Sequence, residues 1–116
     1  MTLEGLVRDK IKLMQSEGIS QATWYVLIGF DTTIEEDIYR FELLRSLGQR
    51  VNPMPYKKVL PEMPDGMITP ENEKMYEALD NYGSMHIQFY LMNFKEYLNS
   101  ERGRYYKKYF INLFAS

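Results

Sequence analysis

An uninterrupted apolar and aromatic run that ends at a glycine constrains this chain most. It covers residues 23–30 (TWYVLIGF) and is rich in β-branched and ring side chains, which predicts a β-strand. Because apolar residues follow one another without alternation, the run is typical of a strand buried on both faces, as in a parallel sheet. By the period of a strand, Tyr25, Leu27 and Gly29 share one face, and Val26 and Ile28 share the other.

A strong helix start follows at once. Thr32 with Glu35 and Thr33 with Glu36 predict two overlapping capping boxes, in a segment whose acids suit the helix dipole. Glu36 and Arg40 are ordered for an ion pair one turn apart. The apolar face of the predicted helix is formed by Ile34, Ile38, Phe41, Leu44 and Leu47. Gly48 supplies the stop.

The next strand is predicted near residues 50–56, where two X-Pro pairs force extended backbone. An amphipathic helix capped by Thr2 and ended by Gly18 precedes the first strand. Gly18 and Gly48 lie 30 residues apart, the length of a βα repeat. Two strands joined by a helix must lie parallel with a right-handed crossover, so the sequence predicts an α/β fold.

The second half of the chain is predicted to be helical. Residues 59–69, within a segment that holds Pro61, Pro64 and Gly66, form a loop or lid. Thr69-Pro70 opens a helix with proline at its first position. An apolar helical stripe then continues from Ile87 to Leu98, and a last helix starts near Glu101 or after Gly103. We therefore expect one compact unit with an α-β-α-β piece (1–58), a loop (59–69) and a helical extension (70–116).

Composition excludes several kinds of chemistry. The chain has no cysteine, which excludes disulfides, thiolate nucleophiles and cysteine-held iron–sulfur clusters. Its one histidine, His86, leaves almost no material for a histidine metal site or a Ser/His/Asp triad. The net charge of −2 argues against a dedicated nucleic-acid-binding protein. Without a long apolar stretch or a signal peptide at the start, we expect a cytoplasmic protein.

Three local patterns have ordinary structural interpretations. His86 stands at the start of a helical stripe, where we expect a surface or cap-region histidine. The acids at 35–37 are those of a helix start rather than a metal or acid–base site. The basic and aromatic segment 102–110 could stack on single-stranded nucleic acid. At helical spacing, however, the same letters predict an apolar face and a solvated basic face.

Gly29 is the most informative single position. It ends a predicted parallel strand and leads to a helix N-terminus, and in α/β folds ligands lie at the carboxyl ends of the strands. A glycine there lets a flat ligand approach the backbone, with Leu27 packed against it. A tight turn explains Gly29 almost as well.

These motifs resemble the C-terminal part of a radical S-adenosylmethionine (radical SAM) domain. The resemblance spans roughly residues 3–58 and rests on the strand ending in Gly29, the Thr-Thr-x-Glu-Glu-Asp helix start and the later Pro-Met-Pro-Tyr at 53–56. It implies the fifth and sixth βα units of a partial TIM-like barrel. It also implies that Leu27 and Gly29 lie against the adenine side of S-adenosylmethionine (SAM), and that Met54 and Tyr56, at the end of the sixth strand, contribute further adenine contacts.

The family's three cluster-binding cysteines have no counterpart here, so this chain cannot bind the [4Fe–4S] cluster of that family. The resemblance thus implies a truncated C-terminal piece that is inactive alone. Its open sheet edges suggest pairing with an N-terminal half or self-association. The alternatives are a helical protein-binding module, and a weak nucleic-acid contact through Arg102, Arg104, Lys107 and Lys108.

Overall fold

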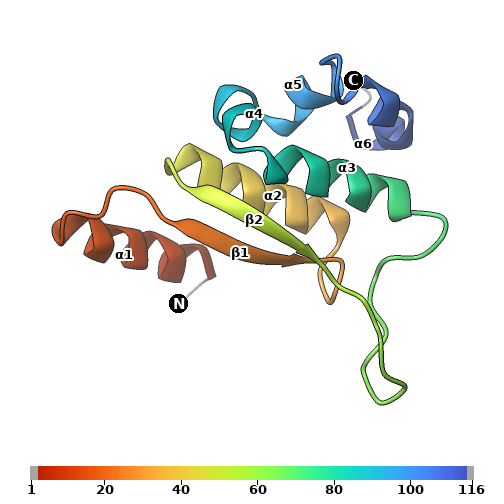
Figure 1. Ribbon diagram of the computed structural model, residues 1–116, viewed down its shortest axis with the longest axis horizontal. Helices are drawn as coiled ribbons and strands as arrows, with labels where there is room; N and C mark the ends of the chain where they lie inside the picture. The colour runs from red at the N-terminus through yellow and green to blue at the C-terminus, as the bar shows by residue number, and fades with distance from the viewer. Residues whose placement is uncertain (1–2, 115–116) are drawn as a thin grey trace.

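A two-stranded parallel sheet forms one side of the hydrophobic core. The computed structural model describes residues 3–114, and Figure 1 shows their arrangement. Strands β1 (Thr23–Ile28) and β2 (Arg50–Pro55) run parallel and pair along their whole length. Helix α2 (Ile34–Ser46) connects them, so the predicted β-α-β unit is confirmed.

Helices account for most of the remaining chain. Helix α1 (Leu3–Ser16) precedes β1, and its expected cap, Thr2, lies outside the described residues. The elements after β2 are α3 (Glu73–Ser84), α4 (His86–Leu91), α5 (Phe94–Leu98), the 3-10 helix η1 (Arg104–Phe110) and α6 (Ile111–Phe114). The expected α/β class with a helical C-terminal half is thereby confirmed. Within residues 3–114 the sheet has two strands and does not close into a barrel.

The sheet buries one face only. Helices α2 and α3 pack against that face, and Figure 1 shows α3 to α6 gathered on one side of the strands. The core between them is built from Val26, Ile28, Phe41, Leu44, Val51, Tyr76, Leu79 and Tyr82, among others. The opposite face exposes Tyr25 (71%), Leu27 (41%) and Met54 (48%). The prediction of a strand buried on both faces is therefore wrong, because the helices leave the second face to solvent.

Helix α2 begins with one capping box rather than two. The Thr33 hydroxyl accepts from the Glu36 N–H (3.2 Å), and the Glu36 carboxylate accepts from the Thr33 N–H (3.0 Å). That backbone hydrogen bond is the main reason why the pKa of Glu36 is lowered. The Thr32 hydroxyl donates to Asp37 instead of forming a second box. Because Glu36 is folded back onto its cap, Arg40 pairs with Asp37 (2.5 Å) and not, as expected, with Glu36.

Helix α3 starts three residues later than the proline signal predicts. Residues 70–72 form a turn, and α3 begins at Glu73 with Asn72 as its N-cap. The Asn72 side chain is used in that turn, since it accepts from the Thr69 N–H (2.7 Å) and donates to the Met67 carbonyl (2.8 Å). Pro70 therefore opens the turn and not the helix.

The predicted stripe from Ile87 to Leu98 is broken into α4 and α5. Met92 is extended (φ −147°, ψ 149°), and Asn93 caps α5 through a reciprocal box with Glu96. On α4, the side chains of Ile87, Tyr90 and Leu91 are exposed. The prediction of one continuous apolar stripe is therefore wrong, because α5 begins at its own N-cap and buries its apolar residues, whereas α4 exposes these three.

The last helical segment also differs from a regular α-helix. Gly103 precedes η1, and a Cβ at this position would lie 2.7 Å from the Tyr97 carbonyl carbon.

The described helices, in residues 3–114, include none that is long and apolar enough to cross a membrane.

Candidate functional site

The structure brings the four predicted site residues to one end of the sheet. Leu27 and Met54 are direct partners in the β1–β2 register, and both side chains lie on the exposed face. Gly29 follows β1, and Tyr56 follows β2 with its N–H bonded to the Ile28 carbonyl (2.9 Å). The carboxyl ends of the strands thus carry two exposed apolar side chains side by side.

Gly29 makes the close approach that the sequence indicates, but with its own chain. Its φ is +75°, and a Cβ there would lie 2.6 Å from Ile68 Cδ1 and 3.3 Å from Tyr76 Cε1. The Gly29 carbonyl accepts from the Met67 N–H (2.7 Å). The backbone that a flat ligand would approach is therefore covered by residues 67 and 68.

We name residues 57–72, between Tyr56 and α3, the strap. The Tyr56 hydroxyl donates to the carbonyl of Pro64 in the strap. The Tyr56 ring is in turn tilted against the Phe30 ring, with the two ring centroids 4.7 Å apart. Gly66 lies so close that a Cβ there would be 2.6 Å from the Tyr56 ring and 2.8 Å from the Gly29 oxygen. The strap thus closes the carboxyl end of β1.

Asp37 holds the same end of the sheet from the other side, and sequence reasoning did not single it out for this role. It is fully buried, and its carboxylate accepts from the Gly29 N–H (3.0 Å), the Thr32 hydroxyl and Arg40 (2.5 Å). Arg40 in turn donates to the Leu27 carbonyl (2.6 Å). A signal existed, because Asp37 lies at helical spacing from Ile34 in the buried stripe.

The side chain of Tyr76 extends from α3 toward Gly29, near Asp37. Its side chain is 3% exposed. Burial, with the nearby Asp37 charge as the second cause, raises its pKa to about 12. The buried region next to Gly29 therefore contains one carboxylate, that of Asp37, and one neutral phenol, that of Tyr76.

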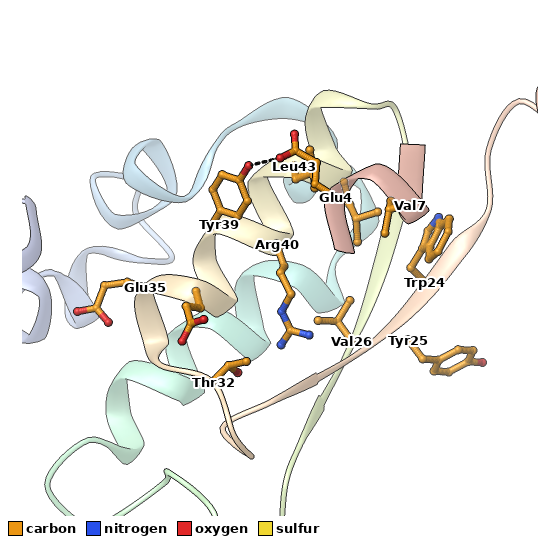
Figure 2. A pocket seen from close by; sticks show the side chains of 12 residues that line it. Glu4, Val7, Trp24, Tyr25, Val26, Thr32, Glu35, Tyr39, Arg40 and Leu43 are labelled. Carbon is orange, nitrogen blue, oxygen red and sulfur yellow. Dashed lines mark hydrogen bonds between the residues drawn. The ribbon is translucent and has the colours of Figure 1, made fainter. Parts of the chain in front are cut away.

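A groove runs along the edge of β1 that does not pair with β2. Figure 2 shows it between α1, β1 and α2, with Val7, Trp24 and Val26 on its apolar side. Its volume is about 560 Å³. At its rim the Tyr39 hydroxyl donates to Glu4 (2.8 Å), which joins α1 to α2. The hydrogen bond from Arg8 is the main cause that lowers the pKa of Glu4, and the hydrogen bond from Tyr39 is the second cause. The link between α1 and α2 therefore involves a charged carboxylate.

Other candidate sites are poor. His86 is the exposed first residue of α4. Among residues 3–114 there is no group of three or more His, Cys, Asp or Glu side chains that could hold a metal ion. The basic side chains expected to face solvent, Arg102, Arg104, Lys107 and Lys108, are all exposed. Lys108 lies over the rings of Tyr105 and Tyr109, 5.2 and 5.3 Å from their centroids, so this base is paired with aromatic rings of its own segment.

No protein-family model, curated protein or solved structure matches this chain. Function must therefore be inferred from the geometry of the site.

Proposed function

We propose that the chain is the C-terminal part of a radical SAM barrel, which contacts the adenine side of SAM through Leu27, Gly29, Met54 and Tyr56. The parallel β1-α2-β2 unit supports this, because it is the repeating unit of such barrels. In a barrel, helices cover the outer face of the sheet, and the ligand binds at the carboxyl ends of the strands. The present sheet is likewise covered by helices on one face, with exposed side chains on the other.

The neighbouring side chains of Leu27 and Met54 are the observation that carries the proposal. They are 41% and 48% exposed, directly opposite in register, and placed where the strands end. An exposed apolar pair of this kind is suited to one face of a flat aromatic ring. Ligands of α/β folds bind at this end of the strands.

The chain would supply binding surface and no redox chemistry. In the family, the [4Fe–4S] cluster supplies the electron that cleaves the sulfonium of SAM. This sequence has no cysteine, so its residues do not fit that cluster. We therefore propose that the chain is inactive alone.

The edge of β1 that faces away from β2 fits a partner strand from the N-terminal half of such a barrel as far as Tyr25, beyond which the Leu27 carbonyl already accepts from Arg40 (2.6 Å). Ala22 and Ile28 direct their carbonyls to β2, so by alternation the N–H of Tyr25 points away from β2. Beside that edge lies the apolar groove lined by Val7, Trp24 and Val26. A strand added there would gain backbone pairing and would bury the groove.

Calorimetric titration with S-adenosylhomocysteine tests the adenine site. We expect weak, saturable binding at millimolar ligand by the wild-type chain. Leu27→Glu and Met54→Glu place a charge on the exposed pair and should each weaken binding about tenfold or more. Both side chains are exposed, so neither substitution should unfold the protein.

Thr23→Glu is the matched control, since Thr23 lies on the same exposed face of β1 at its other end. It should bind like the wild type. The proposal fails if the wild type gives no heat at millimolar ligand, or if all three variants bind equally. Failure would favour a helical protein-binding module.

A further inference from the structure

The strap makes two kinds of contact with the end of β1. Ile68 is apolar and lies on the Gly29 backbone, close enough that a Cβ on Gly29 would be 2.6 Å from it. Met67 contributes a backbone N–H that donates to the Gly29 carbonyl (2.7 Å). The strap thus presents an apolar surface and one hydrogen-bond donor to the same glycine.

Those are the contacts that a flat ring with an amino group would make. Such a ring would pack against Gly29, because a glycine has no side chain of its own to block the approach. Its amino group would donate to the same carbonyl oxygen. Both occupants would therefore use the same Gly29 backbone.

The strap is held by the Ile68 contact and by the hydrogen bonds of Met67 and Tyr56, whereas much of its remaining apolar surface is exposed. Leu60, Met67 and Val59 are 51%, 42% and 73% exposed, so little apolar surface is buried along it. The Lys58–Asp65 ion pair (2.9 Å) is exposed, and such pairs contribute little. Segments with few buried contacts open at low free-energy cost.

We propose that the strap is a built-in competitor of the ligand for the Gly29 backbone, which Ile68 and Met67 occupy until the strap opens. This inference rests on the proposed function, because it concerns the regulation of that same site. The apparent affinity for the ligand is then reduced by the fraction of molecules whose strap is closed. Opening the strap should strengthen binding without any change to the four contact residues.

Two strap substitutions test this and leave the four proposed contact residues unchanged. Ile68→Ser removes the apolar contact on Gly29. Asn72→Ala removes the two hydrogen bonds that its side chain makes within the strap, from the Thr69 N–H and to the Met67 carbonyl, so the strap is held less firmly. Each should tighten S-adenosylhomocysteine binding about tenfold over the wild type. Val59→Ser, in an exposed part of the strap, is the matched control and should leave the affinity unchanged.

Hydrogen exchange supplies a readout that does not depend on affinity. Saturating S-adenosylhomocysteine should accelerate exchange of the Met67 amide in the wild type, because ligand takes its acceptor. If ligand binds while the Met67 amide stays protected and the strap variants keep the wild-type affinity, the competition is refuted and the adenine site stands. If neither wild type nor strap variants bind, the adenine site itself is refuted.

Discussion

At the scale of single residues, Asp37 is the connection between strand, cap and helix. Its carboxylate receives donors from Gly29 in the turn after β1, from Thr32 before α2, and from Arg40 within α2. Since Arg40 also reaches the Leu27 carbonyl, one buried acid fixes the backbone on both sides of the candidate site. The candidate site therefore depends on a residue that cannot itself touch the ligand.

We expect Asp37→Asn to destabilise the protein by about 3 kcal/mol. Removing one partner of a buried charge pair leaves the other uncompensated, and Arg40 already has a buried Nε without a hydrogen-bond partner. Urea unfolding followed by circular dichroism measures the change. Asp31→Asn, at an exposed position in the same turn, should stay within about 0.5 kcal/mol of wild type. A loss below about 1 kcal/mol for Asp37→Asn would contradict the assigned role.

At the scale of elements, the edge of β1 that faces away from β2 predicts self-association when no partner strand is present. The Tyr25 N–H points away from β2, so Tyr25→Pro removes an edge donor and leaves the β1–β2 ladder intact. In sedimentation velocity, we expect the wild type to show dimers that Tyr25→Pro abolishes.

Tyr25→Ala is the control for the loss of the ring, because it keeps the backbone N–H. It should still form dimers. Equal association of the two variants would show that β1 does not pair through this edge, and a wild type that stays monomeric at high concentration would do the same.

Local signals decided which elements sequence analysis found. The strand at 23–28 and the helix after Thr33 were predictable because apolar pattern, cap and glycine stop agree along one short segment. The helical half was predicted less well, because Asn93 and Glu96 form a box inside an apolar stripe that suggests continuity. The exposed face of β1 was not predictable, since one-sided helix cover is a property of the whole fold.

The candidate site divides in the same way. Alternation along the strand placed Leu27 and Gly29, and the parallel pairing placed Met54 opposite Leu27. The contact of Ile68 with Gly29 joins positions 39 residues apart in number through a loop without periodic pattern. No local rule could have predicted it.

At the scale of the whole molecule, the core is rich in buried tyrosines. Tyr76, Tyr82, Tyr97 and Tyr106 are each less than 9% exposed. Burial is the first cause that raises the pKa of all four. For Tyr106, the hydrogen bond to Glu77 is the second cause, and its pKa reaches about 12.

These shifts predict a loss of stability at alkaline pH. An unfolded tyrosine ionises at about pH 10, whereas folded Tyr76 keeps its proton to about 12. Between those values the unfolded state binds fewer protons, so the free energy of unfolding falls as pH rises, and below about pH 10 this effect is absent.

Tyr76→Phe removes one such group. The difference in free energy of unfolding between Tyr76→Phe and the wild type should therefore shift in favour of the variant by about 1.4 kcal/mol between about pH 8 and about pH 11. Urea unfolding at the two pH values measures this. Tyr90→Phe loses the same atom from a ring that is 76% exposed, so the difference between the two variants isolates burial. Parallel pH profiles for Tyr76→Phe and wild type would show that the Tyr76 phenol is not held neutral by the core.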